Sequence, residues 1–342
     1  MPNSDPIKPL RVGLIGGGRI GKVHAQSLKR VGAVIEIIAD PVGDVAETVA
    51  GEYGISKWSK NASDVFCADI DAVIICSPTA LHAEHIVEAA KHKKHIFCEK
   101  PIDFSVAVVN NAIKAVDDAG VKLMIGFNRR FDANFARIKQ AINRDEIGKV
   151  SMLRITSRDP SPPPIEYVKV SGGLFCDMTI HDFDMARFLI GGEVEEVYAM
   201  AQSNDPNIEA VGDIDTAIVL LKFHNGVICN IENSRKAVFG YDQRVEALGS
   251  KGSVNCGNIH PNQVVVSTQE SVRRDLPLYF FLERYMDAYV KEMEEFVRVC
   301  TTDAPVPVGG DAGREALLLA LAANRSLAEN RPVKVEELRK LA

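Results

Sequence analysis

Apolar runs alternate with helical patterns from Arg11 to about Phe127. Short, nearly continuous apolar runs are typical of buried parallel strands, and apolar positions three or four residues apart are typical of amphipathic helices. The predicted strands are 11–15, 34–39, 71–76, 95–98 and 121–125. The predicted helices are 20–31, 43–53, 80–91 and 105–118. This alternation predicts right-handed crossovers and a mostly parallel α/β sheet.

The pattern changes beyond Phe127, where strand-like runs follow one another with few helices between them. The predicted strands are 150–157, 195–202, 214–223, 226–233, 242–248 and 253–255. The predicted helices are 131–143, 173–190, 281–299 and 312–328. Asn225-Gly226 between two apolar runs predicts a hairpin turn. We therefore expect an α+β domain with a largely antiparallel sheet.

The first predicted strand is followed at once by Gly16-Gly17-Gly18-Arg19-Ile20-Gly21 and a helix. In a dinucleotide-binding unit, Gly16 permits the tight turn, Gly18 lets the main chain approach a pyrophosphate, and Gly21 allows close helix–strand packing. Arg19 and Ile20 lie at the helix start, where open N–H groups would hold the pyrophosphate. The sequence predicts a Rossmann domain.

Asp40 closes the second predicted strand, about 20 residues beyond the glycines, where an acid binds a ribose 2′-hydroxyl. The residues after it are Pro41, Val42 and Gly43, so no basic side chain stands beside the acid to bind a 2′-phosphate. This favours NAD over NADP as the cofactor.

A chain of 342 residues is long for a single core, so we expect more than one domain. The expected division is an NAD-binding Rossmann domain at 1–127 and a substrate and oligomerisation domain at 128–305. The segment 306–342 is expected to be a C-terminal helix that packs back on the first domain.

The composition is ordinary for a globular protein, with 25% charged residues and a net charge of −6. No basic surface run indicates nucleic acid or an anionic membrane as a partner. No apolar run is long enough to span a membrane, and residues 1–9 do not have the pattern of a secretory signal. Seven scattered cysteines without Cys-x-x-Cys spacing indicate a reducing compartment. We expect a cytoplasmic protein.

The carboxyl ends of the predicted parallel strands should line the ligand crevice. This places Ser77-Pro78-Thr79 and Glu99-Lys100-Pro101 beside the cofactor. A lysine in a dry crevice can stabilise developing negative charge or take part in proton transfer. Asn128 and Arg129 follow the last predicted strand of this domain, and they too could reach cofactor or substrate.

Asp177 and His181 are four residues apart on the helix predicted at 173–190, so both should project from one face. A carboxylate can fix the tautomer of an imidazole and make it a competent general base. Asp184, three residues after His181, could join this face. An ordinary helical ion pair is the alternative interpretation. Alcohol oxidation by NAD requires no metal, and no further ligand has metal-binding spacing here, so we expect no metal.

These motifs resemble the glucose–fructose oxidoreductase/inositol dehydrogenase (Gfo/Idh/MocA) family over about residues 10 to 330. The resemblance rests on the glycine loop, on Ser77-Pro78-Thr79 with His82, on Glu99-Lys100-Pro101, and on Asp177 with His181. It is greatest for the inositol 2-dehydrogenase branch, through 126–132, 157–160, 177–182 and Gly240-Tyr241-Asp242.

The resemblance implies a second domain built on an open, mostly antiparallel sheet, and a homotetramer. It implies that His181, supported by Asp177, accepts the proton and that Lys100 contacts the reacting hydroxyl. The cofactor would contact Ser77, Pro78, Thr79, His82, Glu99, Lys100, Asn128 and Arg129. The other ring hydroxyls of a polyol would contact Asn128, Arg129, Asp159, Asp184 and Tyr241.

The expected activity is NAD-dependent oxidation of a ring hydroxyl of myo-inositol to an inosose. One alternative is a dehydrogenase of the same family that acts on scyllo-inositol, chiro-inositol or an aldose. A second alternative, from another class, is a sensor that binds NAD without turnover. The joint presence of Lys100, Asp177 and His181 favours the enzyme, because a pure binding protein does not need all three.

Overall fold

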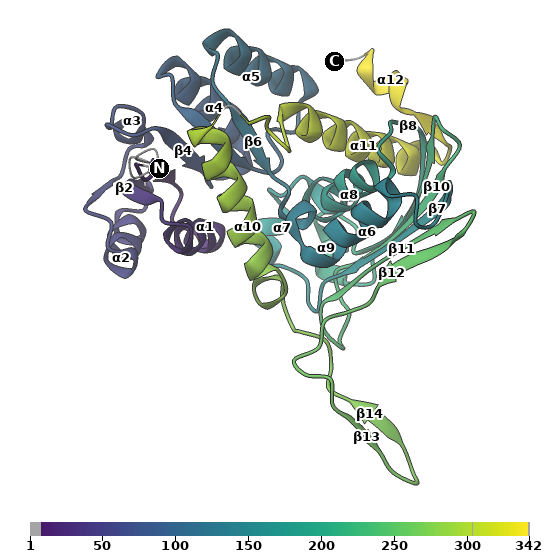
Figure 1. Ribbon diagram of the computed structural model, residues 1–342. Coiled ribbons are helices and arrows are strands. Elements are labelled where there is room, and N and C mark those ends of the chain that lie inside the picture. Colours follow the sequence, from purple (N-terminus) through teal and green to yellow (C-terminus); the bar gives the residue numbers. More distant parts are fainter. Residues whose placement is uncertain (1–7, 303, 341–342) are drawn as a thin grey trace, which may run out of the picture. The chain divides into compact units, whose positions relative to one another are not determined.

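The computed structural model describes residues 8–302 and 304–340. Two compact units divide the chain (Figure 1). Unit 1 contains the chain up to Asn128 together with Met286–Arg314. Unit 2 contains Arg129–Tyr285 and the chain from Glu315 onward. The two later boundaries fall inside helices α10 (Phe281–Thr301) and α11 (Gly310–Glu329).

Unit 1 is built on a six-stranded sheet in which every strand pair is parallel. In sheet order the strands are β3 (Lys57–Ser59), β2 (Val34–Ala39), β1 (Arg11–Ile15), β4 (Ala72–Ile75), β5 (His95–Glu99) and β6 (Leu123–Gly126). Strand order reverses between β1 and β4, which is the topological switch point where such sheets bind dinucleotides. The Rossmann prediction is confirmed.

Helices connect these strands, as the apolar periodicity predicts. They are α1 (Arg19–Arg30), α2 (Gly43–Tyr53), α3 (Ala62–Phe66), a short 3₁₀ turn (Thr79–Leu81), α4 (His82–Lys91) and α5 (Val106–Ala119). The side chains of β4 are all buried, as expected of a strand covered by helices on both faces.

Unit 2 contains a seven-stranded, mostly antiparallel sheet, in which only β7 and β10 pair in parallel among the described residues. In sheet order the strands are β12 (Gly252–Cys256), β11 (Asp242–Gly249), β7 (Val150–Arg158), β10 (Ile228–Ser234), β9 (Thr216–Phe223), β8 (Val194–Gln202) and β15 (Val333–Lys334). The predicted hairpin is confirmed, because Gly226 has φ +88 between β9 and β10.

The helices of unit 2 are α6 (Ala133–Asn143), α7 (Ile165–Val168), a π-helical turn (Phe175–Thr179), α8 (Ile180–Ile190), α9 (Pro206–Ala210) and α12 (Val335–Arg339). They include three short ones that were not predicted, α7, α9 and α12, and a change of helix type within 173–190. The single helix predicted at 173–190 is therefore a π turn that continues into α8, and such turns are frequent at functional sites.

A small hairpin of β13 (Val265–Ser267) and β14 (Val272–Arg274) extends away from β11 and β12 as an arm (Figure 1). Among the described residues, no helix is long and apolar enough to cross a membrane.

Candidate functional site

The glycine loop of unit 1 has the shape that a pyrophosphate requires. Gly16 has φ +96, and a Cβ there would lie 2.4 Å from the carbonyl oxygen of Cys76. A Cβ on Gly21 would lie 2.0 Å from the carbonyl oxygen of Gly16. A Cβ on Gly18, in contrast, would meet nothing within 4 Å. The loop is closed against the sheet and open on its outer side, at the N-terminus of α1, where free N–H groups attract a phosphate.

Asp40 follows β2 and links the glycine loop to the residue that precedes α2. Its Oδ2 accepts a hydrogen bond of 2.8 Å from the Gly17 N–H, and its Oδ1 accepts one of 2.9 Å from the Val42 N–H. Each carboxylate oxygen has a second lone pair, so the group can still accept a hydrogen bond from a ribose hydroxyl. These main-chain contacts were not predicted from the sequence.

Replacing Asp40 with alanine should weaken NADH binding by about 10- to 100-fold, because a hydrogen bond to a charged group contributes about 1.5–3 kcal/mol. The preference for NADH over NADPH should shrink at the same time, because the repulsion of a 2′-phosphate is lost. Titration of cofactor fluorescence with both nucleotides measures these changes. Asp44→Ala, on the exposed surface of α2, is the control and should bind like the wild type. An unchanged nucleotide preference in Asp40→Ala would contradict the cofactor assignment.

The loops that follow β4 and β5 are tied together by His82, at the start of α4. Its Nε2 lies 2.7 Å from the carbonyl oxygen of Ser77, and its Nδ1 lies 2.7 Å from that of Pro101. Burial lowers the pKa of the ring, and the two carbonyl contacts oppose this shift. Both ring nitrogens thus contact main-chain carbonyl oxygens, which favours a structural function for His82 in holding the two loops together. Its contact with the cofactor stays a prediction.

Glu99 is the last residue of β5, and Lys100 follows it directly. The Glu99 carboxyl group is buried, and its Oε1 lies 2.6 Å from Nε2 of His24. Its Oε2 accepts a hydrogen bond of 3.2 Å from the Lys100 N–H. Asn128, after β6, is buried as well. Unit 1 thus brings the glycine loop, Asp40, Ser77 and Lys100 to the carboxyl edge of its sheet.

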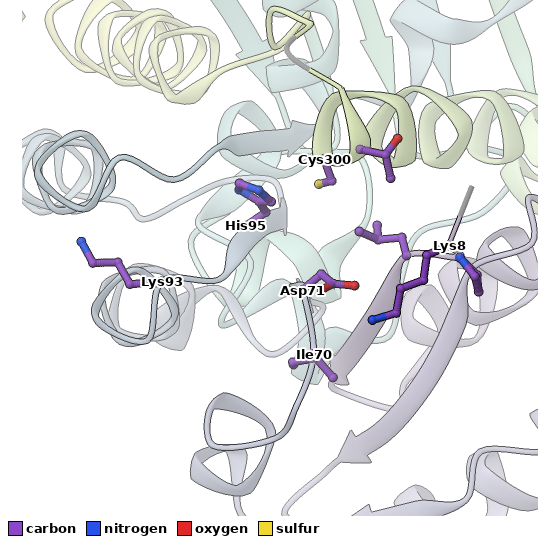
Figure 2. Close-up of a pocket in the computed structure, with 9 residues that line it drawn as sticks. Lys8, Ile70, Asp71, Lys93, His95 and Cys300 are labelled. Carbon is purple, nitrogen blue, oxygen red and sulfur yellow. The ribbon is translucent and has the colours of Figure 1, made fainter. Parts of the chain in front are cut away.

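A different pocket lies at the opposite end of the strands of the same sheet (Figure 2). It has a volume of about 530 Å³ and lies at the amino ends of β1, β4 and β5. Its lining includes Lys8, Asp71, His95 and Cys300. Because open α/β sheets bind their ligands at the carboxyl ends of the strands, this pocket is not the cofactor site.

Asp177 lies in the π turn of unit 2 and has two partners far away in the sequence. Its Oδ1 accepts a hydrogen bond of 2.7 Å from the Tyr167 hydroxyl, and its Oδ2 accepts one of 3.1 Å from Nη1 of Arg235. Arg235 is 1% exposed and also forms an ion pair of 3.6 Å with Asp213. Arg235 and Tyr167 therefore hold the Asp177 carboxyl group in one position. His181 follows in the first turn of α8 and is half-buried.

A buried ion pair lies beside this turn. Nη1 of Arg129 donates a hydrogen bond of 2.6 Å to Oδ1 of Asp182, and Nδ2 of Asn233 donates one of 2.8 Å to Oδ2. The side chains of Arg129 and Asp182 are 6% and 0% exposed. Nη1 of Arg129 thus has its hydrogen-bond partners inside unit 2.

Asp184 is buried and forms a two-point ion pair with Arg130. This pairing favours a structural function for Asp184, and its contact with substrate stays a prediction.

Asp159 and Tyr241 are close to these charges. Burial and the Asp177 carboxylate raise the pKa of Asp159 to about 6. The Tyr241 ring is buried and packs edge-on against Tyr285 at a centroid distance of 5.9 Å. The charges of unit 2 act on Asp159 in opposite directions, because Asp177 raises its pKa and Arg129 lowers it.

Sequence reasoning missed Arg235 and Tyr167 in unit 2, and it missed the buried Glu292 on α10 in unit 1. Arg235 and Tyr167 have no local motif that would pair them with Asp177, because those contacts arise only from the tertiary fold. The sequence did contain a signal that could have identified Glu292. It falls on the apolar stripe of α10 with Tyr289, Met293 and Phe296, all buried, and a carboxyl group at such a position is unusual.

Family comparisons cover both halves of the chain. An oxidoreductase family with an NAD-binding Rossmann fold matches residues 10–127, and the GFO/IDH/MocA C-terminal domain matches residues 135–255. The chain belongs to the GFO/IDH/MocA family. The resemblance inferred from the motifs is confirmed, and the chain is an NAD-binding oxidoreductase.

Relatives match nearly the whole chain. The uncharacterized oxidoreductase YrbE of Bacillus subtilis is 48% identical over 98% of this chain and 99% of its own. A myo-inositol 2-dehydrogenase of Thermotoga maritima is 46% identical over 96% of this chain and 99% of its own. The crystal structure of scyllo-inositol dehydrogenase from Lactobacillus casei with bound NAD(H) and scyllo-inositol has a TM-score of 0.90. It is 29% identical and covers 96% of this chain and 100% of that chain.

The residues of this GFO/IDH/MocA protein fit NAD. The open side of the glycine loop admits a pyrophosphate, and Asp40 stands at the end of β2 with carboxylate lone pairs directed by two main-chain contacts. When bound, NAD supplies a hydride acceptor.

Proposed function

We propose that this chain catalyses the NAD-dependent oxidation of one ring hydroxyl of myo-inositol to an inosose. The observation that carries the proposal is the 46% identity, over nearly the whole chain, with a myo-inositol 2-dehydrogenase. The density of charged and hydroxyl-bearing side chains around the π turn supports it. A polyhydroxylated ring requires many hydrogen-bonding partners, and a site built for each hydroxyl rejects analogues that lack one.

We assign the proton transfer to His181, which accepts the hydroxyl proton as the hydride leaves the same carbon for NAD. Asp177 supports His181, and Arg235 positions Asp177 by a hydrogen bond of 3.1 Å. Lys100 stabilises the negative charge that develops on the substrate oxygen. Asn128, Arg129, Asp159, Asp184 and Tyr241 are the proposed contacts of the other hydroxyls.

We also propose a homotetramer. Apolar side chains project from the outer face of the sheet of unit 2, and Met200, Ile218, Leu220 and Ile228 are 50–62% exposed there. A face of this kind is typical of a protein–protein interface, and a second copy of the chain would cover it. Sedimentation analysis gives the mass of the particle and tests this proposal.

Initial rates of NAD reduction with myo-inositol, scyllo-inositol, chiro-inositol and glucose, each with NAD and with NADP, test the proposed reaction. We expect the highest kcat/KM for myo-inositol with NAD. A preference for another polyol would keep the reaction type and change the substrate. If none of the four is turned over while NADH still binds, the proposed function is wrong, and the activity belongs to another sugar or to a sensor.

The pH dependence of KM should show a titration near 6 that belongs to Asp159. KM for myo-inositol should fall as pH rises through this value, because the ionised carboxylate accepts stronger hydrogen bonds from ring hydroxyls. In Asp159→Asn the step should disappear. Asp145→Asn, in an exposed pair with Lys251, is the control and should keep it. A step of unchanged size in Asp159→Asn would assign the titration to another group.

A further inference from the structure

A buried group of ionisable side chains lies directly behind Lys100 in unit 1. His24 and Glu292 are 0% exposed, and Glu99 is 8% exposed. The Glu99 carboxyl group connects two elements, because one oxygen contacts the His24 ring at 2.6 Å and the other accepts the Lys100 N–H at 3.2 Å. A side chain of α1 is thus linked through one carboxyl group to the main chain of the proposed catalytic lysine.

The surroundings hold this pair in a defined position. The His24 ring packs edge-on against Phe97 at 4.9 Å and against Tyr289 at 5.6 Å between ring centroids. On β6, Gly126 leaves room for the carboxyl group, because a Cβ there would lie 3.0 Å from Cδ of Glu99. A side chain enclosed so closely keeps one rotamer, and it transmits its position to the residue that it binds.

Three other buried ionisable groups of this region, Glu292, Cys76 and Cys98, have raised pKa values. Both carboxyl oxygens of Glu292 are buried without a hydrogen-bond partner among the described residues. Burial, reinforced by the Glu99 charge, raises the pKa of Glu292 well above its usual value. Burial likewise raises the pKa values of the thiols of Cys76 and Cys98. The His24 ring contacts the buried Glu99 carboxyl group at 2.6 Å, and a buried carboxyl oxygen that loses such a hydrogen-bond partner is strongly destabilising.

We propose that His24 is a positioning residue for Lys100, acting through the Glu99 carboxyl group that contacts both residues. A short imidazole–carboxylate contact fixes Glu99, and Glu99 fixes the main chain from which the Lys100 side chain extends. The catalytic part of this inference rests on the proposed function. The coupling of His24 to Lys100 rests on the contacts of unit 1 alone.

The test compares His24→Gln with His92→Gln in the full chain. The two variants carry the same substitution, and His92 belongs to an exposed contact with Glu88 on α4. We expect kcat of His24→Gln to fall by about 10- to 100-fold, as a small misplacement of a catalytic group can do, with little change in NADH affinity. His92→Gln should match the wild type.

A double variant separates positioning from loss of the fold. Combining His24→Gln with Glu99→Gln removes the uncompensated carboxylate and leaves two amides that can bond each other and the Lys100 N–H. We expect this double variant to be less impaired in kcat and in stability than the two single losses added together. Strictly additive losses would overturn the proposed coupling.

Two measurements that require no catalytic turnover test the coupling of His24 to Lys100 independently of the proposed reaction. The rate at which an amine-directed reagent modifies Lys100, followed by peptide mass spectrometry, should change in His24→Gln and not in His92→Gln. In protein labelled with ¹⁵N-histidine, the His24 Nε2–H should be protected from exchange and should shift upfield in Glu99→Gln, because a charge-assisted bond is lost.

If a folded His24→Gln keeps wild-type kcat and wild-type Lys100 reactivity, the proposal is wrong. If the wild type oxidises no polyol while these two readouts behave as expected, only the proposed function fails.

Discussion

Replacing Lys100 with methionine should lower kcat for inositol oxidation by about 10²- to 10⁴-fold, the range expected for a group that assists proton transfer or stabilises charge. Methionine has a similar length and no charge, so the developing negative charge on the substrate oxygen loses its cation. His181→Asn should have an effect of the same size, because no base then accepts the hydroxyl proton. Steady-state rates with myo-inositol and NAD measure both losses.

NADH affinity decides how these losses are interpreted. We expect both variants to bind NADH like the wild type, because an interaction made only in the transition state lowers kcat without changing ground-state binding. Lys114→Met, in an exposed pair with Asp118, and His260→Asn, at a half-buried position to which no part in the reaction is assigned, are the matched controls. Wild-type kcat in both test variants would contradict the assigned functions. A loss of NADH binding in Lys100→Met would make Lys100 a cofactor residue instead.

The regular elements were predictable because their signals are local. The bounds of β1, β2 and α2 agree with the prediction, and the glycine loop lies between β1 and α1 as its motif requires. The short strand β3 was missed. It has three residues, Lys57–Ser59, and they carry no apolar run long enough to be recognised.

The candidate site was less predictable, because its hydrogen bonds join distant residues. Spacing alone places Asp177 and His181 on one face of an ordinary α-helix, whereas Asp177 lies in a π turn that changes the angular relation between them. Arg235 reaches Asp177 from the end of β10, and no periodicity in the sequence reports that contact. Residue type and spacing therefore indicate candidate groups for the chemistry, and the tertiary fold selects their partners.

Replacing Asp182 with alanine should destabilise the protein by about 3–5 kcal/mol, the cost of leaving a charge buried without its partner. Asp182 is 0% exposed and accepts hydrogen bonds from Arg129 and Asn233. Without Asp182, two contacts of the Arg129 guanidinium remain among the described residues. They are the hydrogen bond of 3.2 Å to the Ser157 hydroxyl and the packing over the Tyr285 ring at 5.8 Å from its centre. Neither contact supplies a negative charge.

Urea denaturation followed by circular dichroism measures this change as a shift of the midpoint. The double variant Arg129→Met with Asp182→Leu should lose less stability than Asp182→Ala, because replacing both partners with apolar side chains leaves no uncompensated charge. Asp118→Ala, which breaks an exposed pair with Lys114, should cost at most about 1 kcal/mol. If Asp182→Ala were no more costly than Asp118→Ala, the Arg129–Asp182 pair would not be the buried support of the π turn that its geometry indicates.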